Sequence, residues 1–180
     1  MKKSEIRKKI LKARKINDKK KLVLNFKHIF EILKKNKKIE GVIGGYYPYN
    51  YEINPIQILE KFEKKNYKIS LPKIKKNSQM DFFEWSTKEP LLLNKYGIPE
   101  PISNKIIYPN IFLVPLVAFD KNLNRIGYGG GFYDRYFEKI KKKNKKIITI
   151  GLAFSFQKVK KVPINNHDFK LDYIVTEKGN

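Results

Sequence analysis

The glycines of this chain are concentrated between a strongly apolar segment and an amphipathic one. Four of the ten glycines, Gly127 and Gly129–Gly131, fall within the stretch RIGYGGGFYDRYF at residues 125–137. Glycine costs backbone entropy on folding, so a cluster of glycines needs a structural reason. Residues 111–120 predict a buried strand before the cluster, and residues 132–142 predict a helix after it. The order strand, glycine turn, helix is typical of α/β proteins and of anion sites at helix N-termini.

The remaining pattern also alternates helices and strands. Helices are predicted at residues 3–16, 19–36, 55–65 and 132–142, and strands at 39–47, 67–71, 80–85, 111–120, 147–154 and 171–176. Pro115 predicts a bulge or an early end in the most apolar strand. Residues 86–109 contain four prolines and predict a long irregular connection, and loops of that length are often functional.

These elements predict one α/β domain over residues 1–180. A chain of 180 residues is long enough to bury one substantial core. Alternating strands and helices predict an α/β/α sandwich around a mostly parallel or mixed sheet, with helices on both faces. No internal repeat or domain linker interrupts the pattern.

The composition is strongly basic, with a formal net charge of +23 and a pI of about 9.9. Such a charge usually indicates a nucleic-acid or membrane-surface partner. Here lysine is abundant together with Asn, Ile, Tyr and Phe, which is the joint bias of a low-GC genome. The lysine runs, such as residues 141–143, are therefore interpreted as solvated faces, and nucleic acid is not expected as a partner.

Other features of the composition indicate the cytoplasm. The chain has no cysteine, which excludes disulfides and thiolate metal sites and fits a reducing compartment. The first residues are charged and do not resemble a signal peptide. The longest apolar run, residues 111–119, is far too short to span a bilayer, so no membrane partner is expected.

Arginine is rare, because only Arg7, Arg14, Arg125 and Arg135 occur among the 40 basic residues. Against a lysine background, an arginine marks a place where the planar guanidinium is needed to grip phosphate or carboxylate at two points. Two arginines flank the glycine cluster, and Lys3, Arg7 and Arg14 share one face of the first helix. Alternatively, the four arginines have been retained by chance and mark no binding site.

Familiar phosphate-binding motifs do not match the cluster. A Walker A loop requires Lys-Ser or Lys-Thr after its last glycine, and a dinucleotide fingerprint requires glycine where Phe132 or Asp134 stands. A tight turn is therefore an alternative to an anion site. Asp134 could hold a cation beside phosphates or simply stabilise the helix N-terminus. By itself, the pair His167–Asp168 predicts a turn or cap.

The segment LVPLVAFDKNLNRIGYGGGFYDRYF resembles the signature of 5-formyltetrahydrofolate cyclo-ligases, also called 5,10-methenyltetrahydrofolate synthetases. The resemblance continues through KSEIRKKILKAR, YYPYNYEIN, ISLPKI, MDFFEW, YGIPEP and the closing IGLAFSFQ…VPINNHDFKLDYIVTE. These segments occur in family order over nearly the whole chain. The resemblance implies a fold similar to sugar-phosphate isomerases and CoA-transferases.

The resemblance also implies the reaction. ATP phosphorylates the formyl oxygen of 5-formyltetrahydrofolate, N10 attacks the activated carbon, and 5,10-methenyltetrahydrofolate, ADP and phosphate are formed with the help of Mg²⁺. Little covalent chemistry is required of the protein beyond positioning and electrostatic stabilisation. The implied partners are the two small-molecule substrates, and a monomer is expected.

Site residues follow from the resemblance position by position. ATP would be bound by Lys3, Arg7, Arg125, Ile126, Gly127, Tyr128, Gly129, Gly130, Gly131, Phe132 and Tyr133. The catalytic set would be Arg125, Gly129, Gly130, Gly131 and Tyr133. Folate would contact Tyr47, Glu52, Gly129, Gly130, Gly131 and Phe132, and Mg²⁺ would be held by Asp134 and Asp168.

Some positions remain open. Many family members carry a basic residue where this chain has Tyr128 or Gly130, so phosphate affinity is lower or a nearby lysine substitutes. Arg14 and Arg135 have structural roles or contact ligands. Phe83 and Trp85 form walls of the pterin slot or belong to the core. The competing functions are a basic nucleic-acid-binding module and a relative of the isomerases or CoA-transferases that would not use ATP.

Overall fold

The fold is centred on one six-stranded sheet in a computed structural model that describes residues 1–18, 22–37 and 40–179. The sheet order is β10-β9-β6-β1-β2-β3. The strands are β1 (Val42–Gly44), β2 (Lys68–Ile74), β3 (Met80–Glu84), β6 (Ile111–Pro115), β9 (Ile148–Leu152) and β10 (Tyr173–Val175). Neighbouring strands are parallel except for β2 and β3. The predicted mixed, mostly parallel sheet is confirmed.

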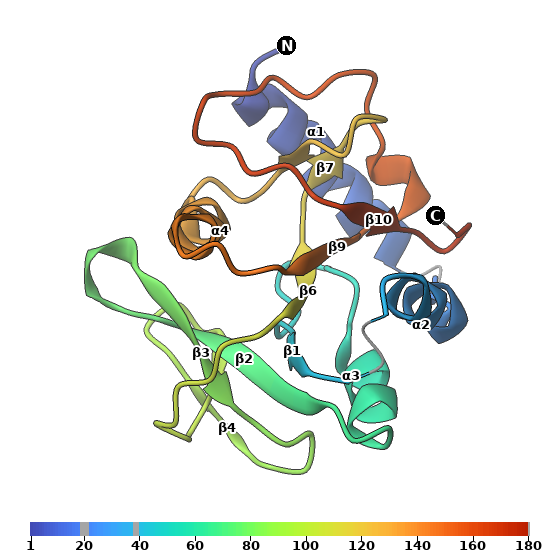
Figure 1. Cartoon of the computed structure of the whole chain (residues 1–180). Helices are drawn as coiled ribbons and strands as arrows, with labels where there is room; N and C mark the ends of the chain where they lie inside the picture. The colour runs from blue at the N-terminus through green and yellow to red at the C-terminus, as the bar shows by residue number, and fades with distance from the viewer. Residues whose placement is uncertain (19–21, 38–39, 180) are drawn as a thin grey trace.

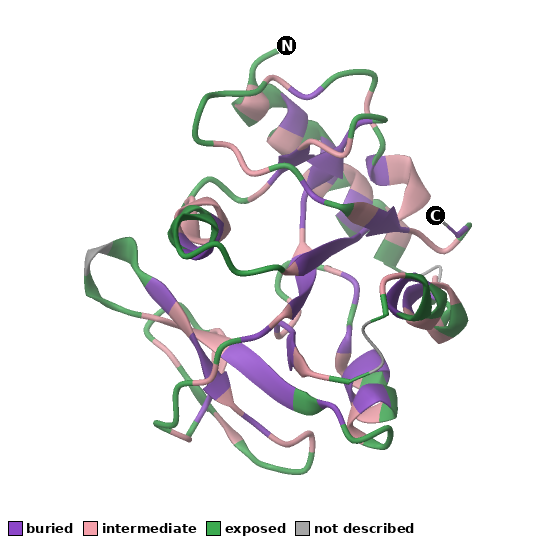
Figure 2. Cartoon of the chain, in the orientation of Figure 1, coloured by how far each residue is buried: buried purple, intermediate pink, exposed green. Residues whose placement is uncertain are grey.

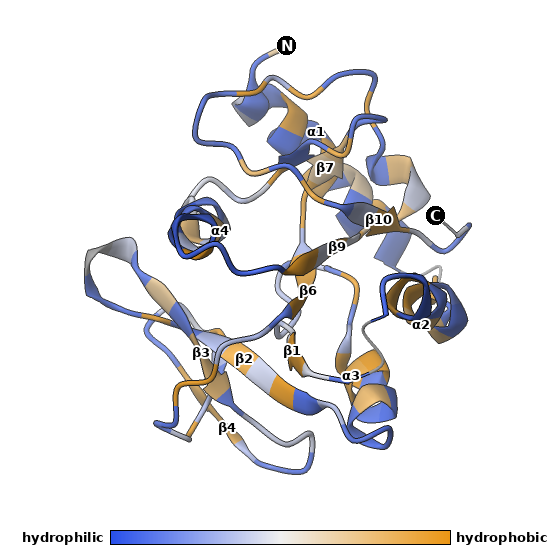
Figure 3. Cartoon of the chain, in the orientation of Figure 1, coloured by the Kyte–Doolittle hydropathy of each residue, from blue (hydrophilic) through white to orange (hydrophobic). Residues whose placement is uncertain are grey.

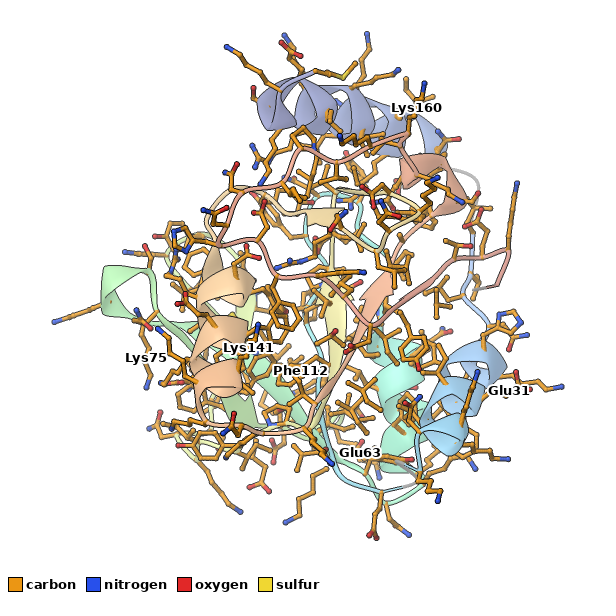
Figure 4. The ribbon with its side chains drawn as sticks, turned by 45° about the horizontal axis from the view of Figure 1, so that its top comes forward. Glu31, Glu63, Lys75, Phe112, Lys141 and Lys160 are labelled. Carbon is orange, nitrogen blue, oxygen red and sulfur yellow. The ribbon has the colours of Figure 1, made fainter. Side chains whose placement is uncertain are left out.

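Helices cover both faces of this sheet (Figure 1). α2 (Phe26–Lys35) and α3 (Ile56–Glu63) lie on one face, and α4 (Phe132–Lys142) lies on the other. Side chains of β6 alternate between the two layers: Ile111 contributes to the core under α2 and α3, whereas Phe112 packs against α4. Figure 4 shows Phe112 in the interior beside α4.

Burial and hydropathy follow the same layers. Figure 2 shows buried residues along the central strands, and Figure 3 shows that these strands are hydrophobic while the outer surfaces of α2 and α4 are hydrophilic. Within the described part of the chain, no helix is long and apolar enough to cross a lipid bilayer.

α1 (Lys3–Asn17) lies apart from the other helices and covers a small two-stranded sheet. Its buried residues Ile6 and Ile10 form a third apolar cluster with Ala118 of β7 (Ala118–Phe119) and Ile126 of β8 (Arg125–Ile126). This packing fixes the rotation of α1 and turns its basic face toward the glycine cluster.

Two predicted elements near the N-terminus were too long. The helix predicted at 19–36 begins at Phe26, because the side chain of Asn25 accepts a hydrogen bond from the amide of Lys27 and caps the helix. Residues 19–21 lie outside the described residues. The strand predicted at 39–47 is limited to Val42–Gly44, and residue 39 also lies outside them.

Two further predictions concern the prolines. The strand predicted at 111–120 ends at Pro115, and Ala118–Phe119 forms a separate strand that pairs with β8. The irregular connection predicted at 86–109 is wrong in part, because β4 (Leu91–Leu93) and β5 (Pro99–Pro101) form an antiparallel hairpin. Its turn is held by Asn94, whose side chain accepts hydrogen bonds from two backbone amides.

The topology places a crevice at the ends of β1 and β6. From β1 the chain crosses through α3 to β2, whereas from β6 it crosses through α4 to β9 in the opposite direction. Loops that leave a parallel sheet in opposite directions open a crevice at the carboxyl ends of the strands, where α/β proteins bind ligands. The loop that follows β1 and the glycine cluster both lie at this crevice.

Candidate functional site

The glycine loop, residues 127–131, joins β8 to the first residue of α4. Gly129 and Gly131 have φ values of 107° and 65°, a region that side-chain-bearing residues rarely adopt. A Cβ atom at Gly130 would lie 2.5 Å from the ring of Phe132. Three of the four glycines are therefore required by the chain's own backbone and side chains.

Three consecutive backbone amides of the loop have no hydrogen-bond acceptor among the described residues. Within the described part of the chain, no acceptor is found for the backbone amides of Gly129, Gly130 and Gly131. Gly129 and Gly130 are also exposed. Free amides before the N-terminus of an eleven-residue helix provide positive potential for an anion.

Basic residues of α1 reach this loop, as their shared helix face predicted. The Nε of Arg7 donates to the carbonyl of Gly127 at 2.7 Å, and its guanidinium carbon lies 3.5 Å from where a Cβ of Gly129 would be. The Nζ of Lys3 lies 2.5 Å from Oδ2 of Asp168. Figure 1 shows the segment between β9 and β10 running past the N-terminal end of α1.

Arg125 lies beneath the loop and fixes Asp134. Arg125 is only 6% exposed. Its guanidinium donates to Oδ1 of Asp134 at 2.9 Å and to the carbonyl of Phe169 at 2.8 Å. The amide of Phe169 donates to the same Oδ1 at 3.1 Å. Asp134 is thereby tied to the residue that directly follows Asp168. The structure thus brings the two predicted metal ligands to neighbouring positions.

The other two arginines also contact the loop. Arg135 donates to the carbonyl oxygens of Gly130 and Ser78, which connects the glycine loop to the turn between β2 and β3. Arg14 donates to the hydroxyl of Tyr128 at 2.7 Å. Each of the four arginines of the chain therefore contacts the loop or the acid that follows it. Among the described residues, the basic side chains that hydrogen-bond to residues 127–131 are those of Arg7, Arg14 and Arg135, and none is a lysine.

A cavity of about 460 Å³ opens beside the loop, with mainly apolar and aromatic walls. Its lining includes three predicted folate contacts, Tyr47, Glu52 and Phe132. Gly129, Gly130 and Gly131 do not belong to the lining. Residues of loops, of strands β2, β3, β5 and β6 and of the start of α4 form the remaining walls: Tyr46, Tyr49, Pro72, Ile74, Met80, Tyr96, Ile98, Pro99, Glu100, Pro115, Tyr128 and Tyr133.

The residues that line the cavity decide whether Phe83 and Trp85 form walls of the pterin slot or belong to the core. Phe83 and Trp85 are 6% and 4% exposed and do not line the cavity, so the structure favours the core interpretation for both. The sequence does not point to Tyr96, because the prolines of residues 86–109 predict an irregular connection. The hairpin turn between β4 and β5 brings it to the cavity, and the turn residues Asn94 and Gly97 were the available signal.

Glu52 is the principal ionisable group of this cavity. Burial raises the pKa of Glu52 to about 7, although hydrogen bonds from Tyr49 and Tyr128 and the charge of Arg14 act in the opposite direction. The hydroxyl of Tyr133 is also buried and has no partner among the described residues. Burial raises the pKa of Tyr133, so this hydroxyl stays protonated and can donate to a ligand. An apolar cavity with a few polar groups is suited to a flat, heteroatom-bearing ligand.

Comparisons with known proteins agree on one family. The model of the 5-formyltetrahydrofolate cyclo-ligase family matches residues 1–177. A 5-formyltetrahydrofolate cyclo-ligase of Haemophilus influenzae is 33% identical over 136 residues, which are 72% of each chain. The NMR structure of a 5,10-methenyltetrahydrofolate synthetase from Aquifex aeolicus is similar with a TM-score of 0.78 at 28% identity, covering 99% of this chain and 91% of that one.

A second solved structure confirms the fold over both full lengths. A 5,10-methenyltetrahydrofolate synthetase from Mycoplasma pneumoniae is similar with a TM-score of 0.72 at 24% identity, covering 98% of this chain and 99% of that one. The family match spans the glycine loop, α1 and the segment that contains Asp168. The chain therefore belongs to the 5-formyltetrahydrofolate cyclo-ligase family and is an enzyme that forms 5,10-methenyltetrahydrofolate.

Proposed function

We propose that this enzyme closes the folate ring in two steps that consume one ATP. The formyl oxygen attacks the γ-phosphorus of ATP, and ADP leaves. N10 then attacks the activated formyl carbon, the bond between carbon and the phosphorylated oxygen breaks, and inorganic phosphate leaves while N10 loses its proton. The protein contributes positioning and electrostatic stabilisation of the charge that develops during phosphoryl transfer.

The glycine loop is the proposed triphosphate site. The backbone amides of Gly129–Gly131, which have no acceptor within residues 1–18, 22–37 and 40–179, supply donors together with the N-terminus of α4. The guanidinium of Arg7 lies against the same loop. Lys3, in the first turn of α1, lies beside Asp168, one of the proposed Mg²⁺ ligands. In this proposal Arg125 acts mainly by holding Asp134, because its guanidinium is buried and already donates to two oxygen atoms.

The proposed Mg²⁺ ligands fit an ion that is also bound by phosphates. Oδ1 of Asp134 and Oδ2 of Asp168 accept hydrogen bonds, but within the described residues the second oxygen of each carboxylate accepts none. Those residues contain no group of three or more potential ligands for a metal. Mg²⁺ commonly takes one or two carboxylates plus substrate phosphates and water. When bound, it would neutralise charge on the phosphates.

The apolar cavity is the proposed pterin site. Tyr47 and Phe132 supply aromatic walls, and Glu52 supplies a carboxyl group that can donate or accept near neutral pH. The hydroxyl of Tyr133, which has no partner in the part of the chain that the structure describes, supplies a donor. These groups fit a pterin, which presents an aromatic face and several nitrogen and oxygen atoms at its edge.

The observation that carries the proposal is that the glycine loop and the cavity share a wall. Tyr128 belongs to the loop, and Phe132 and Tyr133 begin α4, yet all three line the cavity. A triphosphate on the loop would therefore end beside a ligand in the cavity. We further propose a monomer that acts on small molecules in the cytoplasm, without a nucleic-acid partner.

Isotope transfer tests the proposed steps. The enzyme is supplied with Mg-ATP and 5-formyltetrahydrofolate labelled with ¹⁸O in the formyl group, and the released phosphate is examined by mass spectrometry. Attack by the formyl oxygen predicts one ¹⁸O atom in each phosphate. A phosphate whose fourth oxygen comes from water would contradict the proposal, even if methenyltetrahydrofolate were formed.

A further inference from the structure

Arg14 is a buried cation in the middle of the proposed site. The residue is only 2% exposed, although it lies on α1 among lysines that face solvent. Its Nη1 donates to the hydroxyl of Tyr128 at 2.7 Å, and its Nη2 donates to the carbonyl of Leu116. The Nε atom has no partner among the described residues. Burying a guanidinium costs several kcal/mol unless its surroundings compensate, so this position is a costly one.

A short series of contacts leads from Arg14 to Glu52. The hydroxyl of Tyr128 donates to the carbonyl of Tyr49 at 3.1 Å, and the amide of Tyr49 donates to Oε2 of Glu52 at 2.9 Å. The rings of Tyr49 and Tyr128 also meet edge to face, with centroids 5.8 Å apart. Burial raises the pKa of Glu52, whereas the charge of Arg14 and the hydroxyl of Tyr128 each act to lower it.

The two ends of this series belong to different parts of the site. Tyr128 is part of the glycine loop, whereas Glu52 belongs to the loop after β1 and lines the cavity. Arg14 also lines a second cavity of about 400 Å³ on the other side of Glu52. A lysine could supply the charge at this place, but it could not direct two donors in one plane toward Tyr128 and Leu116.

We infer that Arg14 is a positioning residue that couples the glycine loop to Glu52 through Tyr128 and Tyr49. The inference rests on the proposed function, in which the loop binds ATP and Glu52 binds the folate. Arg14 itself contacts neither substrate. It fixes the distance between the two binding parts, so that a phosphate on the loop and a formyl group in the cavity meet.

The test compares Arg14→Lys, Tyr128→Phe and the double variant with Lys15→Gln as a matched control. Lys15 is the next residue of α1 and is exposed. Loss of a hydrogen bond to a charged group costs roughly 1.5–3 kcal/mol, so each single variant is expected to lose about tenfold or more in kcat/KM for 5-formyltetrahydrofolate. Because both changes remove the same contact, the double variant is expected to lose little more than either single variant.

A pH profile separates positioning from a merely structural role. Among the described residues, Arg14 is the charged group whose field acts on Glu52, which is also faced by the hydroxyls of Tyr46, Tyr128 and Tyr133. In Arg14→Gln, the acidic limb of the kcat/KM profile for the folate is expected to move to higher pH. The limb is expected to stay unchanged in Lys15→Gln.

Three results would overturn the inference: normal kinetics in Tyr128→Phe, additive losses in the double variant, or an unchanged pH profile in Arg14→Gln. If Arg14→Gln does not fold, Tyr128→Phe still decides, because it removes one hydroxyl from a residue that is 37% exposed. Failure of the proposed function is distinguishable, since the wild-type enzyme would then transfer no formyl oxygen to phosphate. If the wild-type enzyme transfers the formyl oxygen to phosphate but the Arg14 and Tyr128 variants have normal kinetics, only the coupling between the glycine loop and Glu52 is rejected.

Discussion

The ammonium group of Lys3 lies 2.5 Å from the carboxylate of Asp168, which joins residues 165 positions apart in the sequence. Burial acts to raise the pKa of Asp168, but the hydrogen bonds from Lys3 and Asn165 and the charges of Lys3 and Arg125 lower it. The carboxylate is therefore ionised at neutral pH. This ion pair connects the first turn of α1 to the segment before β10, in which the amide of the next residue, Phe169, donates to Asp134.

Asp168→Asn is expected to keep the fold and lose activity. The amide can still accept from Lys3 and Asn165, but it removes the negative charge proposed to hold Mg²⁺. We expect kcat to fall by about 100-fold or more, the magnitude typical of losing one preorganised charge-stabilising group. Steady-state kinetics over a Mg²⁺ titration, with a melting curve, provide the measurement. A normal rate at low Mg²⁺ would remove Asp168 from the metal site.

Asp134→Asn tests the other proposed ligand. Its Oδ1 atom can be kept as an acceptor for Arg125 and Phe169, so the local structure is expected to persist. Turnover is expected to be abolished, because the second carboxylate beside the phosphates is lost. The rate of methenyl formation at saturating substrates provides the measurement. Near-normal turnover in a folded variant would contradict the assignment.

Arg7→Ala is expected mainly to raise the KM for ATP. The guanidinium contacts the glycine loop and lies at Gly129, outside the lining of the cavity. Loss of a charge-assisted contact to phosphate is expected to raise this KM by about tenfold. The exposed Lys8, replaced by alanine, is the control on the same helix. An unchanged KM for ATP would refute the contact, and an equal rise in the KM for the folate would place Arg7 elsewhere.

Glu52→Gln is expected to change the pH dependence of stability. Because the pKa of Glu52 is raised from 4.5 to about 7 in the folded state, the folded protein binds this proton more tightly than the unfolded chain. The free energy of unfolding therefore falls as the pH rises from about 4.5 to about 7. Glutamine removes this loss. Relative to wild type, the free energy of unfolding of the variant should therefore be higher at pH 8 than at pH 4.5 by about 3 kcal/mol.

Urea unfolding of both proteins at pH 4.5, 6 and 8 measures this difference. The same variant is expected to bind the folate more weakly, since glutamine cannot supply the carboxyl group. A difference between the two proteins that does not vary with pH would show that Glu52 titrates normally. Lys15→Gln, which changes an exposed charge, provides the control for general electrostatic effects.

The predictions from the sequence are confirmed where local preferences and tertiary packing favour the same structure. The helix predicted at 132–142 occurs with those bounds, because a glycine turn precedes it and an amphipathic pattern fills it. Arg7 and Arg14 share a helix face and contact the same loop, as the helical spacing predicted, whereas Lys3 on that face pairs with Asp168. Pro115 ends its strand, as one of the two predicted outcomes.

The missing parts depend on contacts between distant segments. Arg14 and Tyr128 are separated by 114 residues, and no local pattern indicates that the guanidinium would meet that hydroxyl. Tyr96 is held at the cavity by contacts of its hairpin, in which Glu100 accepts hydrogen bonds from Ile74 of β2 and from Asn94. The glycine cluster is predicted as an anion site or a tight turn. Part of the reason for the glycines is different, since side chains of the chain itself, those of Arg7, Arg135 and Phe132, occupy the space beside them.

A structure of the enzyme with Mg²⁺ and a non-hydrolysable ATP analogue tests the central claim most directly. We predict that the terminal phosphate is bound by the amides of Gly129–Gly131, next to Arg7, and that Asp134 and Asp168 share one Mg²⁺. The terminal phosphate should face the cavity that contains Glu52. A nucleotide bound away from the glycine loop, or a metal that touches neither aspartate, would contradict the account.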